Sequence, residues 1–134
     1  MPYLQLEINK KYPIPTKQLL AKRMGEVYAS IMMTDPKRVT VTLCELGEGA
    51  VWRCSEGEPK PAAILMCDIR EGRPKEIREE LAEKLIKLCN ELLGLEINDL
   101  NVEFTQHTGD EMYHQWMGRM SENWSADEGR KPWN

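Results

Sequence analysis

The chain begins with an alternating pattern and continues with a helical one. Leu4, Leu6 and Ile8 are separated by single intervening residues, which is the period of a strand with one buried face. Apolar residues then recur every three or four positions, as they do on one face of a helix: Leu19, Leu20, Met24, Val27, Tyr28 and Ile31. The β-branched segment RVTVTLCEL at 38–46 predicts a second strand. The first part of the chain is therefore expected to form a βαβ unit.

The same order of elements returns in the second half. AAILMCDI at 62–69 predicts a buried strand, the stretch from Pro74 to Gly94 predicts a helix, and NVEFT at 101–105 predicts the closing strand. The two halves align at an offset of 61 residues. The matched pairs are Leu4 and Leu65, Ile8 and Ile69, Leu20 and Leu81, Val27 and Leu88, Val39 and Leu100, and Val41 and Val102.

Two such units predict an α+β fold, a tandem βαβ repeat whose four-stranded mixed sheet carries both helices on one face. The segment AVWRC at 50–54 predicts a short strand or hairpin arm, and the tail is expected to hold a short helix near 109–121 and then an extended arm. One face of the sheet stays uncovered, which favours oligomerisation. We expect a single domain over 1–134, divided into repeat 1 (2–46), a connection (47–60), repeat 2 (61–106) and a tail (107–134).

Charge and composition argue against several classes of function. The net charge of −4, with both signs mixed along the chain, gives no reason to expect binding to nucleic acid or to an anionic membrane. No apolar run has the length of a membrane span or the form of a signal peptide, so a cytoplasmic location is the default expectation. The four cysteines show no CxxC spacing and are expected to be structural thiols, and no metal site is expected.

The second residue, Pro2, stands directly before the first strand. A strand start tolerates proline, which is the simplest explanation of its position. If Met1 is removed, however, Pro2 carries a free secondary amine that can act as a base, whereas with Met1 retained its nitrogen is a tertiary amide. Intact mass would distinguish the two states.

Two arginines lie just before the start of the second helix. Arg70 follows the strand at 62–69, and Arg73 stands just before the helix. They could belong to a solvated face, but two guanidinium groups beside a helix N-terminus also suit a planar carboxylate. Their charge and an apolar pocket would lower the pKa of a nearby ammonium group, so that the amine of Pro2 would be basic near pH 7.

The MP start on a strand, the doubled βαβ unit and the motif IREGRP at 69–74 resemble the tautomerase superfamily, and within it the group of cis-3-chloroacrylic acid dehalogenase. The resemblance covers roughly residues 2 to 120. It implies a tautomerase or MIF-like fold, Pro2 as acid or base, and Arg70 and Arg73 as ligands of the substrate carboxylate. It also implies a homotrimer and no cofactor.

The sequence departs from the dehalogenase pattern at three positions. A substrate-binding histidine of that group falls at Tyr28, which either donates a hydrogen bond to the substrate or fills the core. The tyrosine and glutamate that activate water there fall at Glu103 and His114. Both remain auxiliary candidates, although a surface position on the tail helix is the favoured interpretation of His114.

Three functions follow, in decreasing order of support. The first is a cofactor-independent tautomerase of a small 2-keto or 2-hydroxy-enoic acid, such as a phenylpyruvate-like or 2-hydroxydienoate substrate. The second is a hydratase or dehalogenase of 3-substituted acrylates, or a decarboxylase of a short β-keto acid, for which the expected water activator is missing. The third is an interaction protein without enzymatic activity. Trp52, Trp116 and Trp124 either line the pocket or serve in packing, which is the favoured interpretation.

Overall fold

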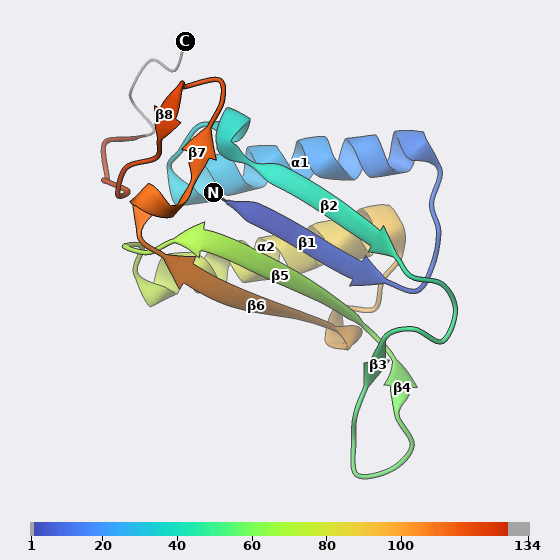
Figure 1. Cartoon of the computed structure of the whole chain (residues 1–134). Helices are drawn as coiled ribbons and strands as arrows, with labels where there is room; N and C mark the ends of the chain where they lie inside the picture. Colours follow the sequence, from blue (N-terminus) through green and yellow to red (C-terminus); the bar gives the residue numbers. More distant parts are fainter. Residues whose placement is uncertain (1, 129–134) are drawn as a thin grey trace.

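A four-stranded mixed sheet with both helices on one face forms the body of the protein (Figure 1). The computed structural model describes residues 2–128. Strand order is β2-β1-β5-β6, with β1 at Tyr3–Ile8, β2 at Thr40–Glu45, β5 at Ala63–Arg70 and β6 at Leu100–His107. β1 pairs with β2 and β5 with β6 in parallel, and β1 pairs with β5 antiparallel. The predicted tandem βαβ arrangement is confirmed.

The two helices have the same length and equivalent boundaries. Helix α1 covers Ile14–Met32 and follows Pro13, while α2 covers Lys75–Leu93 and follows Pro74. Proline favours a helix start because its fixed φ suits the first turn and its missing N–H is not needed there. Both helices end at a left-handed residue, Met33 (φ 53°) after α1 and Gly94 (φ 70°) after α2. Short 3-10 turns at Pro36–Arg38 (η1) and Ile97–Asp99 (η2) then lead into β2 and β6.

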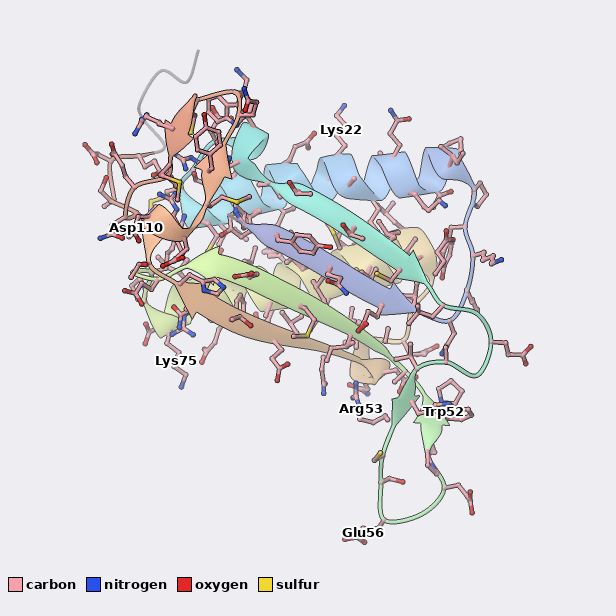
Figure 2. The ribbon with its side chains drawn as sticks, viewed as in Figure 1. Lys22, Trp52, Arg53, Glu56, Lys75 and Asp110 are labelled. Carbon is pink, nitrogen blue, oxygen red and sulfur yellow. The ribbon has the colours of Figure 1, made fainter. Side chains whose placement is uncertain are left out.

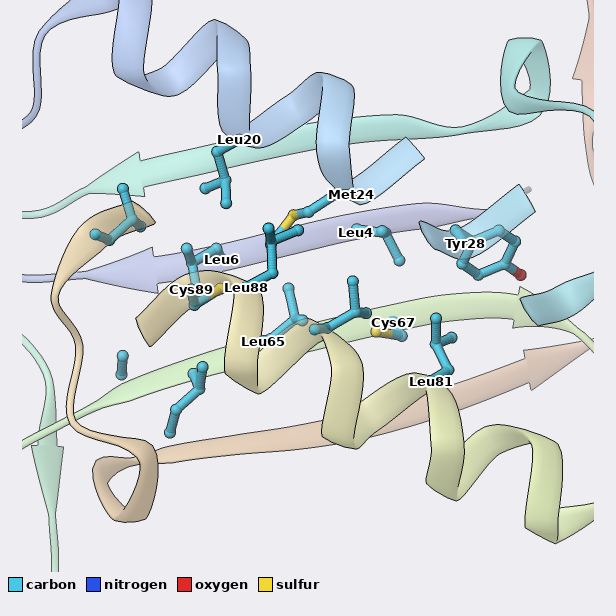
Figure 3. Close-up of a cluster of buried hydrophobic side chains, with 14 of the residues drawn as sticks. Leu4, Leu6, Leu20, Met24, Tyr28, Leu65, Cys67, Leu81, Leu88 and Cys89 are labelled. Carbon is cyan, nitrogen blue, oxygen red and sulfur yellow. The ribbon is translucent and has the colours of Figure 1, made fainter. Parts of the chain in front are cut away.

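The hydrophobic core lies between the sheet and the helices (Figure 3). β1 alternates as predicted, so that Leu4, Leu6 and Ile8 are fully buried and the residues between them are half-buried. Cys67 and Cys89 lie in this core as free thiols, and burial raises the pKa of each to about 12. Figure 3 shows Tyr28 at one end of the cluster, with its hydroxyl oxygen pointing away from Leu4.

A hairpin connects the two βαβ units and projects from the body. Its strands are β3 at Trp52–Arg53 and β4 at Lys60–Pro61, which pair antiparallel and confirm the hairpin arm predicted for this region. Figure 2 shows Trp52, Arg53 and Glu56 on this projection, away from the two helices.

The tail differs from the sequence-based expectation. In place of a helix near 109–121 it forms a single 3-10 turn at Gly109–Glu111 (η3) and a hairpin of β7 (Tyr113–His114) and β8 (Arg119–Met120). Gly118, with φ 68°, lies in the turn of that hairpin, where glycine adopts the left-handed conformation without strain. The predicted tail helix is therefore wrong.

The sheet face opposite the helices has no covering element within residues 2–128. On β5 the fully buried positions alternate with half-buried ones, which include Met66 and Asp68. The imidazole of His107 in β6 lies against the carboxylate of Asp68 on this face. No helix in the described part of the chain is long and apolar enough to cross a membrane.

Candidate active site

Several elements meet at one end of the sheet. β1 begins there beside the end of β5, because the two strands run antiparallel with Tyr3 opposite Asp68. The end of α1, the start of α2 and the tail hairpin gather at the same end (Figure 1). Pro2 is buried at this point, and its carbonyl accepts a hydrogen bond from the Thr40 amide at 3.2 Å. Met1, whose removal would free the amine of Pro2, lies outside the described residues.

Arg70 is almost completely buried at this end of the sheet, with 2% of its surface exposed. Its Nη1 donates to the carbonyl of Glu122 at 2.6 Å, and its Nη2 forms an ion pair with the carboxylate of Glu128. Both partners belong to the tail, which therefore covers the guanidinium. A guanidinium has five N–H donors, and the hydrogen bonds within residues 2–128 occupy two of them.

The Glu128 carboxylate is the anion at the centre of this cluster. It accepts hydrogen bonds from Arg70 and from the hydroxyl of Thr34, and it lies 3.9 Å from Nε of Arg38. Burial by itself would raise the pKa of Glu128, but the hydrogen bonds from Arg70 and Thr34 and the charge of Arg38 hold that pKa below its ordinary value. Glu128 is therefore ionised at neutral pH.

Arg73 binds the end of α1. Its Nε and Nη2 donate to the carbonyl of Met32 at 3.3 and 3.1 Å, and its Nη1 donates to the carbonyl of Arg70 at 3.5 Å. Its guanidinium stacks on the ring of Trp124, 4.8 Å from the centroid, and the indole N–H of Trp124 donates to the carbonyl of Met33. Burial lowers the pKa of Arg73 to about 10, which leaves it charged at pH 7.

Two neutral polar side chains at this end are buried without a hydrogen-bond partner among the described residues. The Tyr28 hydroxyl is one of them, and burial raises the pKa of this phenol far above its usual range. The other is Nε2 of His114, a residue that is 6% exposed. Burial lowers the pKa of His114 to about 4, and nearby positive charges, among them those of Arg38 and Arg70, add to the shift. The expectation of a surface position for His114 is therefore wrong, because β7 turns its side chain inward.

Among the sequence-predicted residues, Glu103 is separate from this cluster. It is exposed in the middle of β6, opposite Met66, and it lines a hollow of about 310 Å³ with Ile64 and Leu100. Pro2, Tyr28, Arg70, Arg73 and His114, in contrast, all belong to the end of the sheet described above.

Sequence reasoning missed Arg38 and Glu128, and for Trp124 it favoured packing over a place in the pocket wall. Arg38 is 2% exposed and donates to the Ser121 hydroxyl at 2.8 Å, and burial lowers its pKa. Its place just before β2 was a usable signal, because β2 runs parallel to β1 and therefore starts at the same end. Glu128 and Trp124 lie in a tail segment that shows no hydrophobic period, so no comparable signal existed for them.

The chemistry available at this end is that of an anion site. Three guanidinium groups and one carboxylate leave a net positive charge among the described residues, and Tyr28 and His114 can add neutral hydrogen bonds. The same positive charge and burial would favour the neutral form of a nearby amine. Among residues 2–128, no group of three or more His, Cys, Asp or Glu side chains is arranged to bind a metal ion.

Comparison with known proteins supports the fold assignment. No family model matches the chain, and no curated protein matches it either. Among solved structures it is similar to N1, a member of the cis-3-chloroacrylic acid dehalogenase (cis-CaaD) family. The TM-score is 0.80 at 18% identity, over 96% of this chain and 88% of that chain.

Two further structures show the same likeness. Pt0534 inactivated by 2-oxo-3-pentynoate matches with a TM-score of 0.73 at 22% identity, over 89% of this chain and 95% of that chain. A fused 4-OT, Q0, solved as a symmetric trimer, matches with a TM-score of 0.74 at 20% identity, over 89% and 94%. The resemblance to the tautomerase superfamily and its dehalogenase group is thus confirmed at the level of the fold.

Proposed function

We propose that this chain, which has the fold shared by these dehalogenase and tautomerase structures, is a cofactor-independent tautomerase of a small 2-keto or 2-hydroxy-enoic acid. The observation that carries the proposal is the burial of Pro2 at the end of the sheet where Arg38, Arg70 and Arg73 converge. An amine at the start of β1 and cations at the end of β5 are the groups that proton transfer on a carboxylic acid requires.

In the proposed reaction the neutral amine of Pro2 removes the proton from the enol hydroxyl of the substrate. The resulting enolate takes a proton at carbon from the Pro2 ammonium group, so that the keto form leaves and the amine is regenerated. Arg70 and Arg73 hold the substrate carboxylate, and the guanidinium charge stabilises the enolate more than the neutral enol. Tyr28, whose hydroxyl is a neutral donor, donates a hydrogen bond to the enolate oxygen.

The number of unused donors supports these roles. Hydrogen bonds within residues 2–128 occupy two of the five N–H donors of Arg70 and three of those of Arg73. Each arginine therefore retains two or more donors for a ligand. A carboxylate binds a guanidinium best through two parallel hydrogen bonds, which these remaining donors can supply.

The test is ketonisation of phenylpyruvate enol and of 2-hydroxymuconate by wild type and Pro2→Ala, with intact mass recorded to establish the removal of Met1. We expect Pro2→Ala to lower kcat/KM by about 10²–10⁴-fold. Treatment with 2-oxo-3-pentynoate, the compound that inactivated Pt0534, should add one equivalent of mass to wild type at Pro2. A wild-type protein with a free proline terminus and no turnover of either enol would refute the proposal.

A second candidate, the addition of water to a 3-substituted acrylate, is favoured by one observation. Nε2 of His114 is buried and without a hydrogen-bond partner in the described part of the chain, so the neutral imidazole can accept a hydrogen bond from a water molecule and orient it. In that case His114→Gln would abolish release of halide from 3-haloacrylates and leave ketonisation intact. Loss of neither activity would remove His114 from both mechanisms.

We further infer a homotrimer assembled through the uncovered sheet face. The half-buried positions on that face and the trimeric state of the similar fused 4-OT support this assembly. Light scattering at micromolar concentration should give three times the mass of one chain.

A further inference from the structure

The guanidinium of Arg70 already binds a carboxylate in this structure, namely the side chain of Glu128. Glu128 is 3% exposed, and its side chain accepts hydrogen bonds from the Arg70 guanidinium and the Thr34 hydroxyl, with Arg38 at 3.9 Å. These partners are of the kind that a planar substrate carboxylate requires, namely a guanidinium, a hydroxyl and a second cation. Glu128 therefore has the same charge, shape and partners as the ligand that the proposed reaction would bring to Arg70.

The tail is anchored firmly up to Trp124. The carbonyl of Glu122 accepts a hydrogen bond from Arg70, the side chain of Asn123 accepts one from the amide of Gly109 at 2.9 Å, and Trp124 stacks on Arg73. Gly109 packs so closely against this segment that an added Cβ would lie 2.1 Å from the carbonyl oxygen of Glu122. This part of the tail is thus a fixed wall of the site.

Beyond Trp124 the tail is attached differently. Residues 125–127 are exposed and form a turn closed by the amide of Glu128, which donates to the carbonyl of Ser125 at 3.0 Å. Glu128 is the next buried residue. The carboxylate is therefore carried on an exposed turn of three residues and can leave Arg70 while the Glu122–Trp124 anchor stays in place. We refer to residues 125–128 as the strap.

We infer that Glu128 is a built-in competitor for the substrate carboxylate, so that binding of a carboxylate ligand to Arg70 releases the strap and Glu128 sets the affinity and selectivity of the site. The inference rests on the proposed function, since it assigns to Arg70 the binding of a substrate carboxylate. A tethered group competes as if present at an effective concentration on the order of millimolar, which excludes weak anions and admits ligands with further contacts in the pocket. Glu128 is thus a residue that determines specificity.

The direct test measures binding of benzoate, a carboxylate that undergoes no tautomerisation, by calorimetry at pH 7. The variant Glu128→Gln removes the competing charge and keeps the side-chain size, and we expect it to lower the Kd of benzoate by about tenfold. The neutral analogue benzamide should bind both proteins equally weakly. The matched control is Asp127→Asn, which removes one negative charge from the same exposed turn and should leave the Kd of benzoate within about twofold.

A second measurement uses the wild-type protein and so does not depend on the folding of a variant. Hydrogen exchange of the Glu128 amide should become faster at saturating benzoate, because release of the strap breaks its hydrogen bond to Ser125. The amide of Gly109, which marks the fixed anchor, should not change.

The opposite results would overturn the inference. Glu128→Gln with an unchanged or larger Kd for benzoate, or slower exchange of the Glu128 amide in the presence of benzoate, would mean that Glu128 positions Arg70 and completes the site. Failure of the proposed function would appear differently, as an absence of enol turnover in wild type and Glu128→Gln alike, while the ratio of the two benzoate Kd values would still report on the strap.

Discussion

At one end of the sheet Arg73 donates to the carbonyl of Met32, the last residue of α1, and at the opposite end Tyr12 donates to the carbonyl of Leu93, the last residue of α2. These positions are equivalent in the repeat, since 73 − 12 and 93 − 32 both equal 61. A neutral hydroxyl, that of Tyr12, is thus sufficient to bind the last carbonyl of a helix in one half of the molecule. The charge of Arg73 and its further donors exceed what closing the helix requires, and under the proposed function they are available to a ligand.

The same comparison holds for Arg70 and Asn9, which are also 61 positions apart (70 − 9). The Asn9 side chain donates to the carbonyl of Val51 at 3.1 Å and accepts from the amide of the same residue at 2.8 Å, which fixes the base of the projecting hairpin. At the other end Tyr28 and His114 keep buried polar atoms without a partner among the described residues. At the end that carries Asn9, the side chain forms its hydrogen bonds with the backbone of the same chain. The end that carries Tyr28 and His114 retains buried polar groups whose hydrogen bonds a ligand can supply.

The largest expected effect is on activity, and it distinguishes Arg73 from Tyr12, the two residues that donate to the last carbonyl of a helix. Arg73→Met should lower kcat/KM for phenylpyruvate enol by about 10²–10³-fold, because in the proposed reaction it removes a cation that stabilises the enolate. Tyr12→Phe should leave kcat/KM unchanged and lower the free energy of unfolding by about 1 kcal/mol, because it removes one neutral hydrogen bond. Steady-state kinetics and urea unfolding of both variants check this. Equal loss of activity in the two variants would show that helix closure, not charge, is what catalysis needs.

The next effect concerns the tail, which packs against the end of the sheet that carries Arg70 and Arg73. Gly109→Ala should lower the free energy of unfolding by about 2 to 3 kcal/mol, because its Cβ would collide with the backbone of Glu122. The control is Gly25→Ala in α1, where an added Cβ meets no atom within 4 Å and alanine should stabilise the helix by about 0.5 to 1 kcal/mol. Denaturant midpoints of the two variants should therefore move in opposite directions.

Acid should lower the free energy of unfolding through the protonation of His114. Its pKa is about 4 in the folded chain against an ordinary value of 6.5, so the unfolded chain binds more protons between these values. The free energy of unfolding should therefore fall as the pH drops from 6.5 towards 4, by about 1 to 2 kcal/mol after allowance for solvent screening. The pKa of Glu128 is lowered in the folded chain, so its own contribution is lost at still lower pH. Urea unfolding at pH 7 and 5 should show the loss in wild type, and an equal loss in His114→Gln would assign it to another group.

The smallest effect compares the two helix ends directly. Met33 and Gly94 are 61 positions apart (94 − 33) and both adopt the left-handed conformation, with φ 53° and 70°. Met33→Gly should raise the free energy of unfolding by about 0.5 to 1 kcal/mol, and Gly94→Ala should lower it by about 1 kcal/mol, because only glycine adopts this conformation without strain. Thermal unfolding of the pair measures both shifts, and two shifts of the same sign would contradict the interpretation.

Sequence periodicity was sufficient for the body of the fold because local propensity and burial agree there. Alternation in β1 and the apolar stripes of both helices predicted the four-stranded mixed sheet and its covered face, whereas the strand order was not predicted. The position of Arg70 at the end of its strand followed from the same repeat, whereas its place beside the start of β1 follows from the antiparallel pairing that the structure shows. Those predictions needed no contact between distant residues beyond strand pairing.

The rest of the site depends on contacts that leave no local pattern. Glu128 reaches Arg70 across a separation of 58 positions in sequence, and its segment lacks a period that would place it. His114 was expected on a helix surface, but the hairpin β7–β8 turns it inward, and this hairpin is fixed by pairing with Arg119 rather than by propensity. Tertiary packing of an aperiodic tail therefore decided which residues complete the anion site.

The projecting hairpin between β3 and β4 lies far from the cluster of arginines, and it is the link between two halves that each contribute to that cluster. Pro2, Tyr28 and Arg38 precede the hairpin in the chain, whereas Arg70 and Arg73 follow it. A cut in the exposed loop near Glu56 would therefore turn the candidate active site into an interface between two separate polypeptides, joined through β1 and β5. Activity recovered by mixing the two fragments would then serve as a direct assay of how strongly the two βαβ units recognise each other.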